Sequence, residues 1–117
     1  MATNEVDFSV RVYTTQVPID KPGAELNYKG LICVNKYFYR TEYSPYPLKD
    51  ESARDTMRTE LIEKAKTKAA ELSANAIVGM RIETCENMFV SKHNNFYQTI
   101  EMVFYGTAVY YFRTKDE

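Results

Sequence analysis

The chain of 117 residues is long enough to bury one hydrophobic core but not two, so we expect a single domain over residues 1–117. Hydrophobic residues make up 44% of the chain and charged residues 26%, a balance that excludes a disordered protein. Fifteen basic and sixteen acidic residues leave a formal net charge of −1, which gives no general field to attract nucleic acid or an anionic membrane, so neither is expected as a partner.

The N-terminal sequence MATNEVDFSV lacks the basic and apolar regions of a signal peptide, and no apolar run approaches the roughly 20 residues of a membrane helix. We therefore expect a cytoplasmic protein. In the overlapping stretch VDFSVRVYT, residues 6, 8, 10 and 12 are apolar and residues 7, 9 and 11 are polar. This alternation predicts a half-buried strand.

Residues 18–27, PIDKPGAELN, carry two prolines and a glycine and predict a connector. Residues 28–39, YKGLICVNKYFY, are rich in β-branched and aromatic residues and predict a second strand. Pro45 and Pro47 then disfavour helix, which indicates an extended loop over residues 40–50. The tyrosines of residues 37–46 either cover the core or form a stacking surface for a planar ligand or a partner.

A long helix is predicted to begin near Asp50 or Ser52, because either side chain has an oxygen that caps a first turn, and to end near Ala74 or Asn75. Apolar residues recur along one face at spacings of three and four, namely Met57, Leu61, Ala65, Ala69 and Leu72. This amphipathic pattern predicts a helix that lies with one face on a sheet.

The segment ELSANAIVGMRIET, residues 71–84, changes from a helical to a strand pattern within about four residues. Asn75 is expected to adopt the left-handed conformation that closes the helix. Val78, Met80 and Ile82 share one face of the new strand, and Gly79 indicates a bulge or the close approach of another backbone. With almost no loop, the helix must fold directly back over the sheet.

The sequence HNN at residues 93–95 predicts a hairpin turn before a long final strand, QTIEMVFYGTAVYYF, which we expect to bend at Gly106. Residues 100, 102 and 104 share an apolar face with 106, 108 and 110, while residues 103, 105, 109 and 111 give the other face an apolar or aromatic character. Since one helix covers only one face, the second face should meet either a further copy of the chain or the N-terminal strand and the tyrosine-rich loop. We favour self-association.

These motifs resemble the YbjQ-like family, in which a helix closes on a leucine, a small residue and a short Ala/Asn/Ala run before VVG, and the last strand contains GTAV. The residues that match are Leu72, Ala74, Asn75, Ala76, Val78 and Gly79 in the first motif, and Gly106, Thr107, Ala108 and Val109 in the second. The similarity is carried by residues 50–112, so residues 1–49 contribute the N-terminal strands and the Tyr/Pro-rich loop.

The resemblance implies an α+β subunit of the dodecin-like or YbjQ-like type, with a β-α-β-β core, an added N-terminal strand, and one long helix on an antiparallel sheet. It also implies that copies assemble into a closed ring, usually a pentamer, and the family label refers to heavy-metal binding although its biochemical role is not established. The residues expected at the subunit interface or in close packing are Arg58, Gly79, Gly106, Thr107 and Ala108.

The metal-ligand types in the chain are sparse: the soft donors are Cys33, Cys85 and His93, with no CxxC or HxxxH spacing, and Glu83 and Glu86 could add oxygen donors. We expect both cysteines to be buried structural thiols, and we predict no cofactor. A symmetric ring could still collect one thiol from each copy. This leaves a metal ion or small ligand held between subunits as the alternative function.

No catalytic motif is present, because GxSxG, a P-loop and GxGxxG are all missing and the one histidine has no nearby candidate nucleophile. We therefore do not expect an enzyme. A helical wheel places Arg54 and Arg58 on the apolar side of the helix, where a cation must reach solvent or a carboxylate. Arg58 is either solvated or paired with Glu83 or Glu101 of a neighbouring copy.

Overall fold

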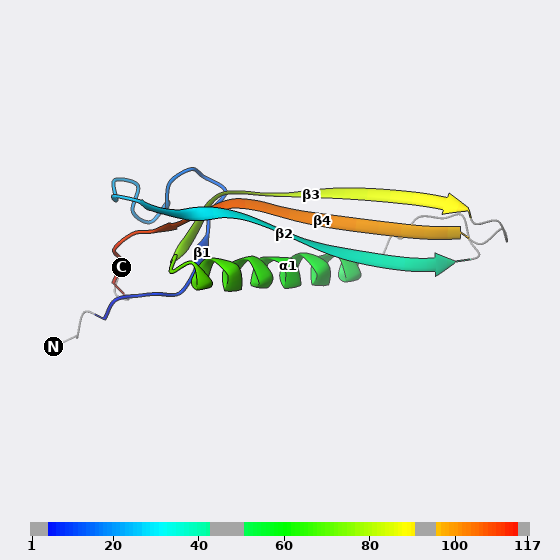
Figure 1. Ribbon diagram of the computed structural model, residues 1–117, viewed down its shortest axis with the longest axis horizontal. Coiled ribbons are helices and arrows are strands. Elements are labelled where there is room, and N and C mark those ends of the chain that lie inside the picture. The colour runs from blue at the N-terminus through cyan, green and yellow to red at the C-terminus, as the bar shows by residue number, and fades with distance from the viewer. Residues whose placement is uncertain (1–4, 43–50, 91–95, 115–117) are drawn as a thin grey trace.

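The computed structural model describes residues 5–42, 51–90 and 96–114, and the side chains of residues 5–37, 54–86 and 99–114. Its elements are β1 (Arg11–Val12), β2 (Asn27–Glu42), α1 (Glu51–Glu71), β3 (Ala76–Val90) and β4 (Phe96–Tyr110) (Figure 1). This order confirms the predicted α+β class with a β-α-β-β core and one added N-terminal strand. Of the loop predicted over residues 40–50, residues 40–42 instead belong to β2, so this part of the prediction is wrong. Residues 43–50 and the turn that includes His93 lie outside the described residues.

The four strands form one sheet in the order β1-β3-β4-β2. β4 lies between β2 and β3 and is antiparallel to both, as expected of an antiparallel sheet. β1 instead pairs in parallel with the first two residues of β3, so the sheet as a whole is mixed. Because β2 and β3 run in the same direction, the chain between them must cross over, and α1 makes that crossover on one face of the sheet (Figure 1). No helix among the described residues is long and apolar enough to cross a membrane.

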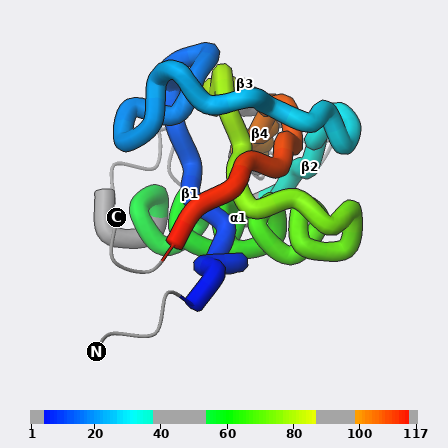
Figure 2. The backbone as a smooth tube through the Cα atoms, turned by 90° about the vertical axis from the view of Figure 1, so that its left-hand side faces the viewer, coloured from blue at the N-terminus to red at the C-terminus, as the bar shows by residue number. Residues whose placement is uncertain are grey.

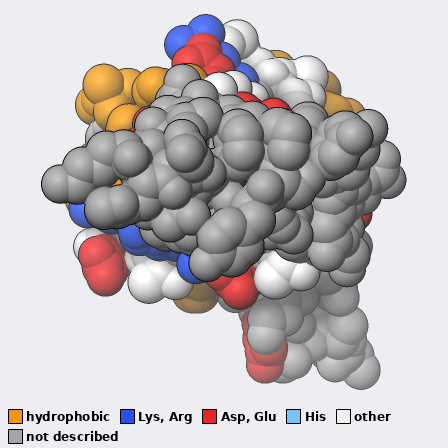
Figure 3. Space-filling model, turned by 90° about the vertical axis from the view of Figure 1, so that its right-hand side faces the viewer, with side chains coloured by type: hydrophobic (Ala, Val, Ile, Leu, Met, Phe, Trp, Pro, Cys, Tyr) orange, Lys and Arg blue, Asp and Glu red, His pale blue; other side chains and the backbone are white. Residues whose placement is uncertain are grey.

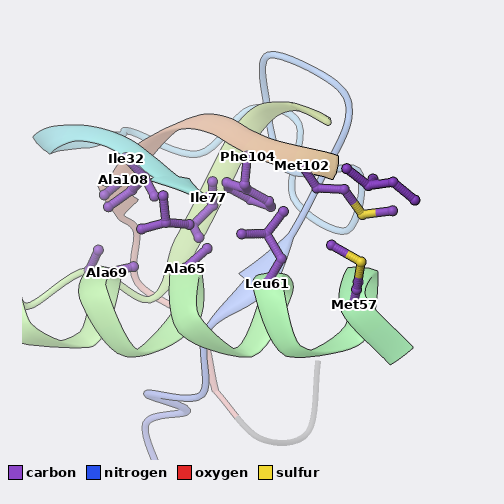
Figure 4. Close-up of a cluster of buried hydrophobic side chains, with 12 residues drawn as sticks. Ile32, Met57, Leu61, Ala65, Ala69, Ile77, Met102, Phe104 and Ala108 are labelled. Carbon is purple, nitrogen blue, oxygen red and sulfur yellow. The ribbon is translucent and has the colours of Figure 1, made fainter. Parts of the chain in front are cut away.

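The core lies between α1 and the face of the sheet that it covers. The helix contributes a stripe of residues spaced four apart, and the sheet contributes residues from β2, β3 and β4 (Figure 4). Leu61, Ala65 and Ala69 are fully buried, and the two alanines let the helix lie close to the strands. The buried side chains that meet in this layer include Met57, Leu61, Ala65, Ala69, Ile32, Ile77, Ile100, Met102, Phe104 and Ala108.

The helix ends earlier than the sequence indicated, and Ser73 rather than Asn75 takes the left-handed conformation, with φ of 63°. The amide of Ala74 donates to the carbonyl of Ala69 at 3.0 Å, and the amide of Ser73 donates to the carbonyl of Ala70 at 3.0 Å. These two bonds are the Schellman arrangement that satisfies the last carbonyls of a helix. The turn also takes Leu72 off the helical stripe, so its predicted place in the core is wrong and the side chain is exposed.

Asn75 has a different role at the join. Its side chain is buried and donates to the carbonyl of Tyr111 at 2.8 Å, while its amide oxygen accepts from the Tyr111 amide at 3.0 Å. The Asn75 side chain therefore takes the place of a neighbouring strand, because it bonds both backbone groups of Tyr111, the residue that follows β4. This bond ties the start of β3 to the C-terminal end of the chain.

The predicted strand over residues 6–12 is only partly present. Its regular part is the two-residue strand β1, with an isolated bridge between Val6 and Thr114. Phe8, expected on the buried face, is 67% exposed, although Val10 and Val12 do pack against the core. The prediction for Phe8 is wrong because Asp7, on the face expected to meet solvent, is instead buried against Arg113.

Gly79 forms a bulge, which is one of the two alternatives that the sequence left open. Its φ is +63°, and the β3–β4 register shifts between Val78 and Arg81. Gly106, on β4, provides close packing, since a Cβ there would overlap the Cγ2 methyl of Ile77. The two glycines thus let β3 and β4 change register while Ile77 stays in the core.

The molecule is elongated, with principal extents of 67 × 27 × 22 Å. β2, β3 and β4 continue past the N-terminal end of α1 as a three-stranded ribbon, which we call the arm (Figure 1). At the opposite end, the loop over residues 14–26 lies on the side of the sheet away from α1 (Figure 2). The helix therefore covers only part of one face of the sheet.

Candidate functional site on the helix-free face

Alternation along the strands gives the sheet a second face that α1 does not touch, called here the helix-free face. Ile32 and Val34 of β2 are buried, whereas the odd-numbered residues around them are exposed. The side chains on this face are those of Leu31, Cys33, Asn35, Tyr37, Arg81, Glu83, Cys85, Glu101, Val103, Tyr105 and Thr107. Leu31 is 74% exposed and Tyr37 is 66% exposed, which is unusual for large apolar groups.

Both cysteines lie on this face and are exposed, so the expectation that they are buried is wrong. Strand parity explains the error, because the β2 sequence around Cys33 is apolar on both faces and the pattern could not say which face the helix covers. Cys33 pairs in register with Tyr105, and Cys85 pairs with Glu101, four residues further along β4. From strand spacings the two thiols are about 16 Å apart, too far to bind one ion within a single chain.

The described residues contain no group of three or more His, Cys, Asp or Glu side chains that could hold a metal ion. His93 lies outside them, and Glu83 and Glu86 are exposed on β3. The sequence-predicted metal ligands are therefore not brought together in this part of one chain.

A small polar cluster joins β2 and β4 near the arm. The Asn35 side-chain amide donates to Glu101 at 3.1 Å, and this bond lowers the pKa of the Glu101 carboxyl. A hydrogen bond to the same carboxylate raises the pKa of Tyr37. Each shift favours the state that the group already has at neutral pH, so the cluster holds the side chains in place and supplies no acid or base.

The residues predicted at an interface or in close packing take several positions. Ala108 is buried in the core, Gly106 packs on Ile77, and Thr107 is half-buried on the helix-free face. Arg58 is exposed on α1 and lies 3.1 Å from Asp55. Arg54, also on α1, makes an ion pair with Glu86 of β3. Arg54 therefore pairs with a carboxylate of its own chain.

A polar network that the sequence patterns did not indicate holds the N-terminal segment against the residues after β4. Arg113 is fully buried, its Nη1 donates to the Tyr111 hydroxyl at 3.1 Å, and its Nε lies 3.1 Å from an oxygen of Asp7. The Nε contact is an ion pair, since Nε is not aligned for a hydrogen bond. Ser9 donates to Asp7 through both its hydroxyl and its amide, and these bonds lower the pKa of Asp7 to about 2.

Asp20 is the second anion of this network. Burial favours its protonated form, but hydrogen bonds from the Tyr13 and Tyr111 hydroxyls outweigh burial and lower its pKa. Burial, together with its bond to Asp20, raises the pKa of Tyr13. Arg11 lies between the two carboxylates, 3.2 Å from Asp7 and 2.9 Å from Asp20. Each charge meets an opposite charge, which makes the network a structural clamp.

Comparisons with known proteins agree with this architecture. The family model described as "Putative heavy-metal-binding" (YbjQ) matches residues 43–111, more than half of the chain. A crystal structure of a protein of unknown function from Pediococcus pentosaceus, which belongs to the DUF74 family, is similar with a TM-score of 0.61. The two chains are 18% identical, and the alignment covers 86% of this chain and 95% of the other. No curated protein matches the sequence.

The matched residues contain α1, β3, β4, the Schellman turn at the helix end and the bulge at Gly79, and β2 directly precedes them. The chain therefore belongs to the YbjQ family.

Proposed function

We propose that the protein is a homo-oligomeric, ring-forming binding or scaffold subunit, whose arm and helix-free face pack against further copies. The observation that carries the proposal is the shape of the single chain. Its radius of gyration is 18.7 Å, whereas a compact chain of this length has about 13 Å. Seen from the end of the arm, the described side chains at the rim include both hydrophobic and charged groups (Figure 3).

The accessible surface supports the same proposal. The chain exposes 7606 Å², whereas a monomer of 13.6 kDa is expected to expose about 6,600 Å². The excess of about 1,000 Å² is close to the roughly 800 Å² that each partner buries in a stable interface. A second copy is a suitable occupant, since it presents the same uncovered arm.

Both edges of the sheet are also available for pairing. Within the described residues no strand pairs with the outer edge of β2, and the N-terminal segment bonds β3 no further than Met80. Long open edges invite another chain to pair with them. Pairing of the β2 edge of one copy with the β3 edge of the next would be head-to-tail, and such contacts form a ring when the rotation between successive copies closes. A pentamer is the ring that the family likeness favours.

Sedimentation velocity at micromolar concentration tests this proposal. The wild-type chain should sediment as one species larger than a monomer. Tyr37→Lys adds a charge to the helix-free face next to the arm and should shift the distribution toward smaller species, while Thr59→Lys, on the exposed side of α1, should not. A wild-type monomer would refute the proposal, and equal profiles for the two variants would remove Tyr37 from the interface.

The second candidate is a metal or small ligand held between subunits. The exposure of Cys33 and Cys85 favours it, because thiols on a face shared by several copies can converge although those of one chain cannot. Protein purified without chelator should then contain stoichiometric metal, measured by elemental mass spectrometry, and the Cys33→Ser/Cys85→Ser variant should lose it. Equal metal content in the variant and the wild type would reject this candidate.

A further inference from the structure

The β3 bulge and the Gln16 side chain border an open pocket of about 510 Å³ on the helix-free face. Gly79 leaves room for the Gln16 side chain, since a Cβ on Gly79 would come within 2.9 Å of the Gln16 amide nitrogen. The side chains that line the pocket include Gln16, Leu31, Cys33, Arg81, Tyr105 and Thr107. All of them come from one chain, so the pocket does not need a neighbour in order to form.

Arg81 places a positive charge at this pocket. Its guanidinium lies 5.1 Å from the centroid of the Tyr105 ring, which holds the planar group against β4. Its Nε lies 3.6 Å from a carboxylate oxygen of Glu83, and both side chains are more than half exposed. An ion pair of this length and exposure contributes little, so a ligand anion can replace Glu83 as the partner of Arg81.

Three further polar groups at the pocket have unused hydrogen-bonding capacity. The Gln16 side-chain amide and the hydroxyls of Thr107 and Tyr105 make no hydrogen bond with another described residue. Together with Arg81 they provide donors to a single small volume. Convergent donors around one cation are the arrangement that recognises an oxyanion such as a carboxylate or a phosphate.

The opposite wall of the pocket is apolar. Leu31 is 74% exposed, and Cys33 next to it is also exposed, although both lie among the core strands. An apolar wall beside a cationic one selects ligands with two different ends.

From this combination we infer that the pocket at the β3 bulge binds a small organic anion that carries a flat apolar group. The anionic end meets Arg81 and the donors of Gln16 and Thr107, and the apolar end lies against Leu31 and Cys33. The pocket forms within one chain and does not require the proposed ring. It adds to the proposed binding function because a neighbouring copy on the same face would close the open side of the pocket.

The test uses three probes with the full-length protein: benzoate, the neutral and similarly shaped benzamide, and acetate, which has no ring. Affinities are measured by saturation-transfer difference NMR, which works for a monomer and for a ring. Benzoate should bind between about three- and tenfold more tightly than either other probe, because only benzoate uses both walls. In proton–nitrogen correlation spectra of the protein, the backbone amide shifts that benzoate changes should centre on Gly79 and Gly106.

Variants on the surface separate the two walls. Arg81→Gln should lower benzoate affinity to that of benzamide and leave benzamide unchanged, whereas Leu31→Ser should weaken both aromatic probes. Glu83→Gln, which removes the competing carboxylate, should strengthen benzoate binding. Arg58→Gln, on α1 and away from this face, is the matched control and should bind as the wild type does.

Circular dichroism and melting temperatures confirm that each variant is folded. Equal affinities of benzoate and benzamide, no detectable binding of either, or equal losses in Arg81→Gln and Arg58→Gln would overturn the inference. Sedimentation is recorded on the same samples, so a monomer that binds benzoate in the expected way would uphold the pocket while refuting the ring.

Discussion

Gly106→Ala tests how closely β3 and β4 pack under the helix. A Cβ on Gly106 would overlap the Cγ2 methyl of Ile77, and Ile77 is fully buried, so neither residue can move into solvent. The φ of Gly106 is not in the left-handed region, so an alanine adds a steric cost and no backbone strain. Overpacking of this kind destabilises a core by about 1–3 kcal/mol.

The compensating change is Ile77→Ala, which removes the methyl that the new Cβ would overlap. Alone, Ile77→Ala should destabilise the protein by about 2–5 kcal/mol because it leaves a cavity in the core. In the double variant the Cβ introduced by Gly106→Ala enters part of that cavity. The double variant should therefore be more stable than the sum of the single effects by at least about 1 kcal/mol.

Urea denaturation followed by far-ultraviolet circular dichroism measures all four proteins at one protein concentration, since assembly would make stability depend on concentration. Strictly additive free energies of unfolding, or a Gly106→Ala variant as stable as the wild type, would refute the close packing of Gly106 on Ile77.

Three other predictions concern the β3 bulge, the polar clamp around Asp7 and the ion pairs of α1. Gly79→Ala should cost about 1–2 kcal/mol in a urea titration, because φ is +63° there, and Gly79→Asn should cost less; equal costs would argue against a backbone cause. The pKa of Asp7 is lowered to about 2, so the ionised Asp7 carboxylate should stabilise the fold above pH 4, and this stabilisation should be lost as the pH falls toward 2. Asp7→Asn should therefore flatten the plot of melting temperature against pH between pH 4 and 2. An unchanged slope would contradict the bonds from Ser9. Arg54→Ala should lower the melting temperature more than Arg58→Ala, since only Arg54 links the helix to β3, and the reverse order would return Arg58 to the interface role expected from the sequence.

Periodicity predicted the larger elements well. The apolar spacing along α1 is strict, and residues 100, 102, 104 and 108 of β4 lie on the buried face as expected. Gly79 could be assigned to a bulge because a glycine inside a strand has few other structural uses. These signals are local, so one sequence contains all the information that they require.

The failures came from contacts between distant residues. Asp7 and Ser9 looked solvated because their partner Arg113 lies about a hundred positions away in the sequence. Cys33 looked buried because alternation gives two faces without saying which one the helix covers. Asn75 has the right chemistry for a helix end, yet its side chain is used to bond Tyr111. The pocket at the bulge likewise depends on Gln16 from a loop.

Native mass spectrometry of protein purified without chelator measures whether the chain associates with itself through the arm and the helix-free face. The chain has a mass of 13.6 kDa, so a self-associating protein should give one dominant species at an integer multiple of that mass, with a pentamer as the expected ring. Added mass on that species would reveal a bound ion or ligand. A dominant species at 13.6 kDa across micromolar concentrations would show that the chain does not self-associate.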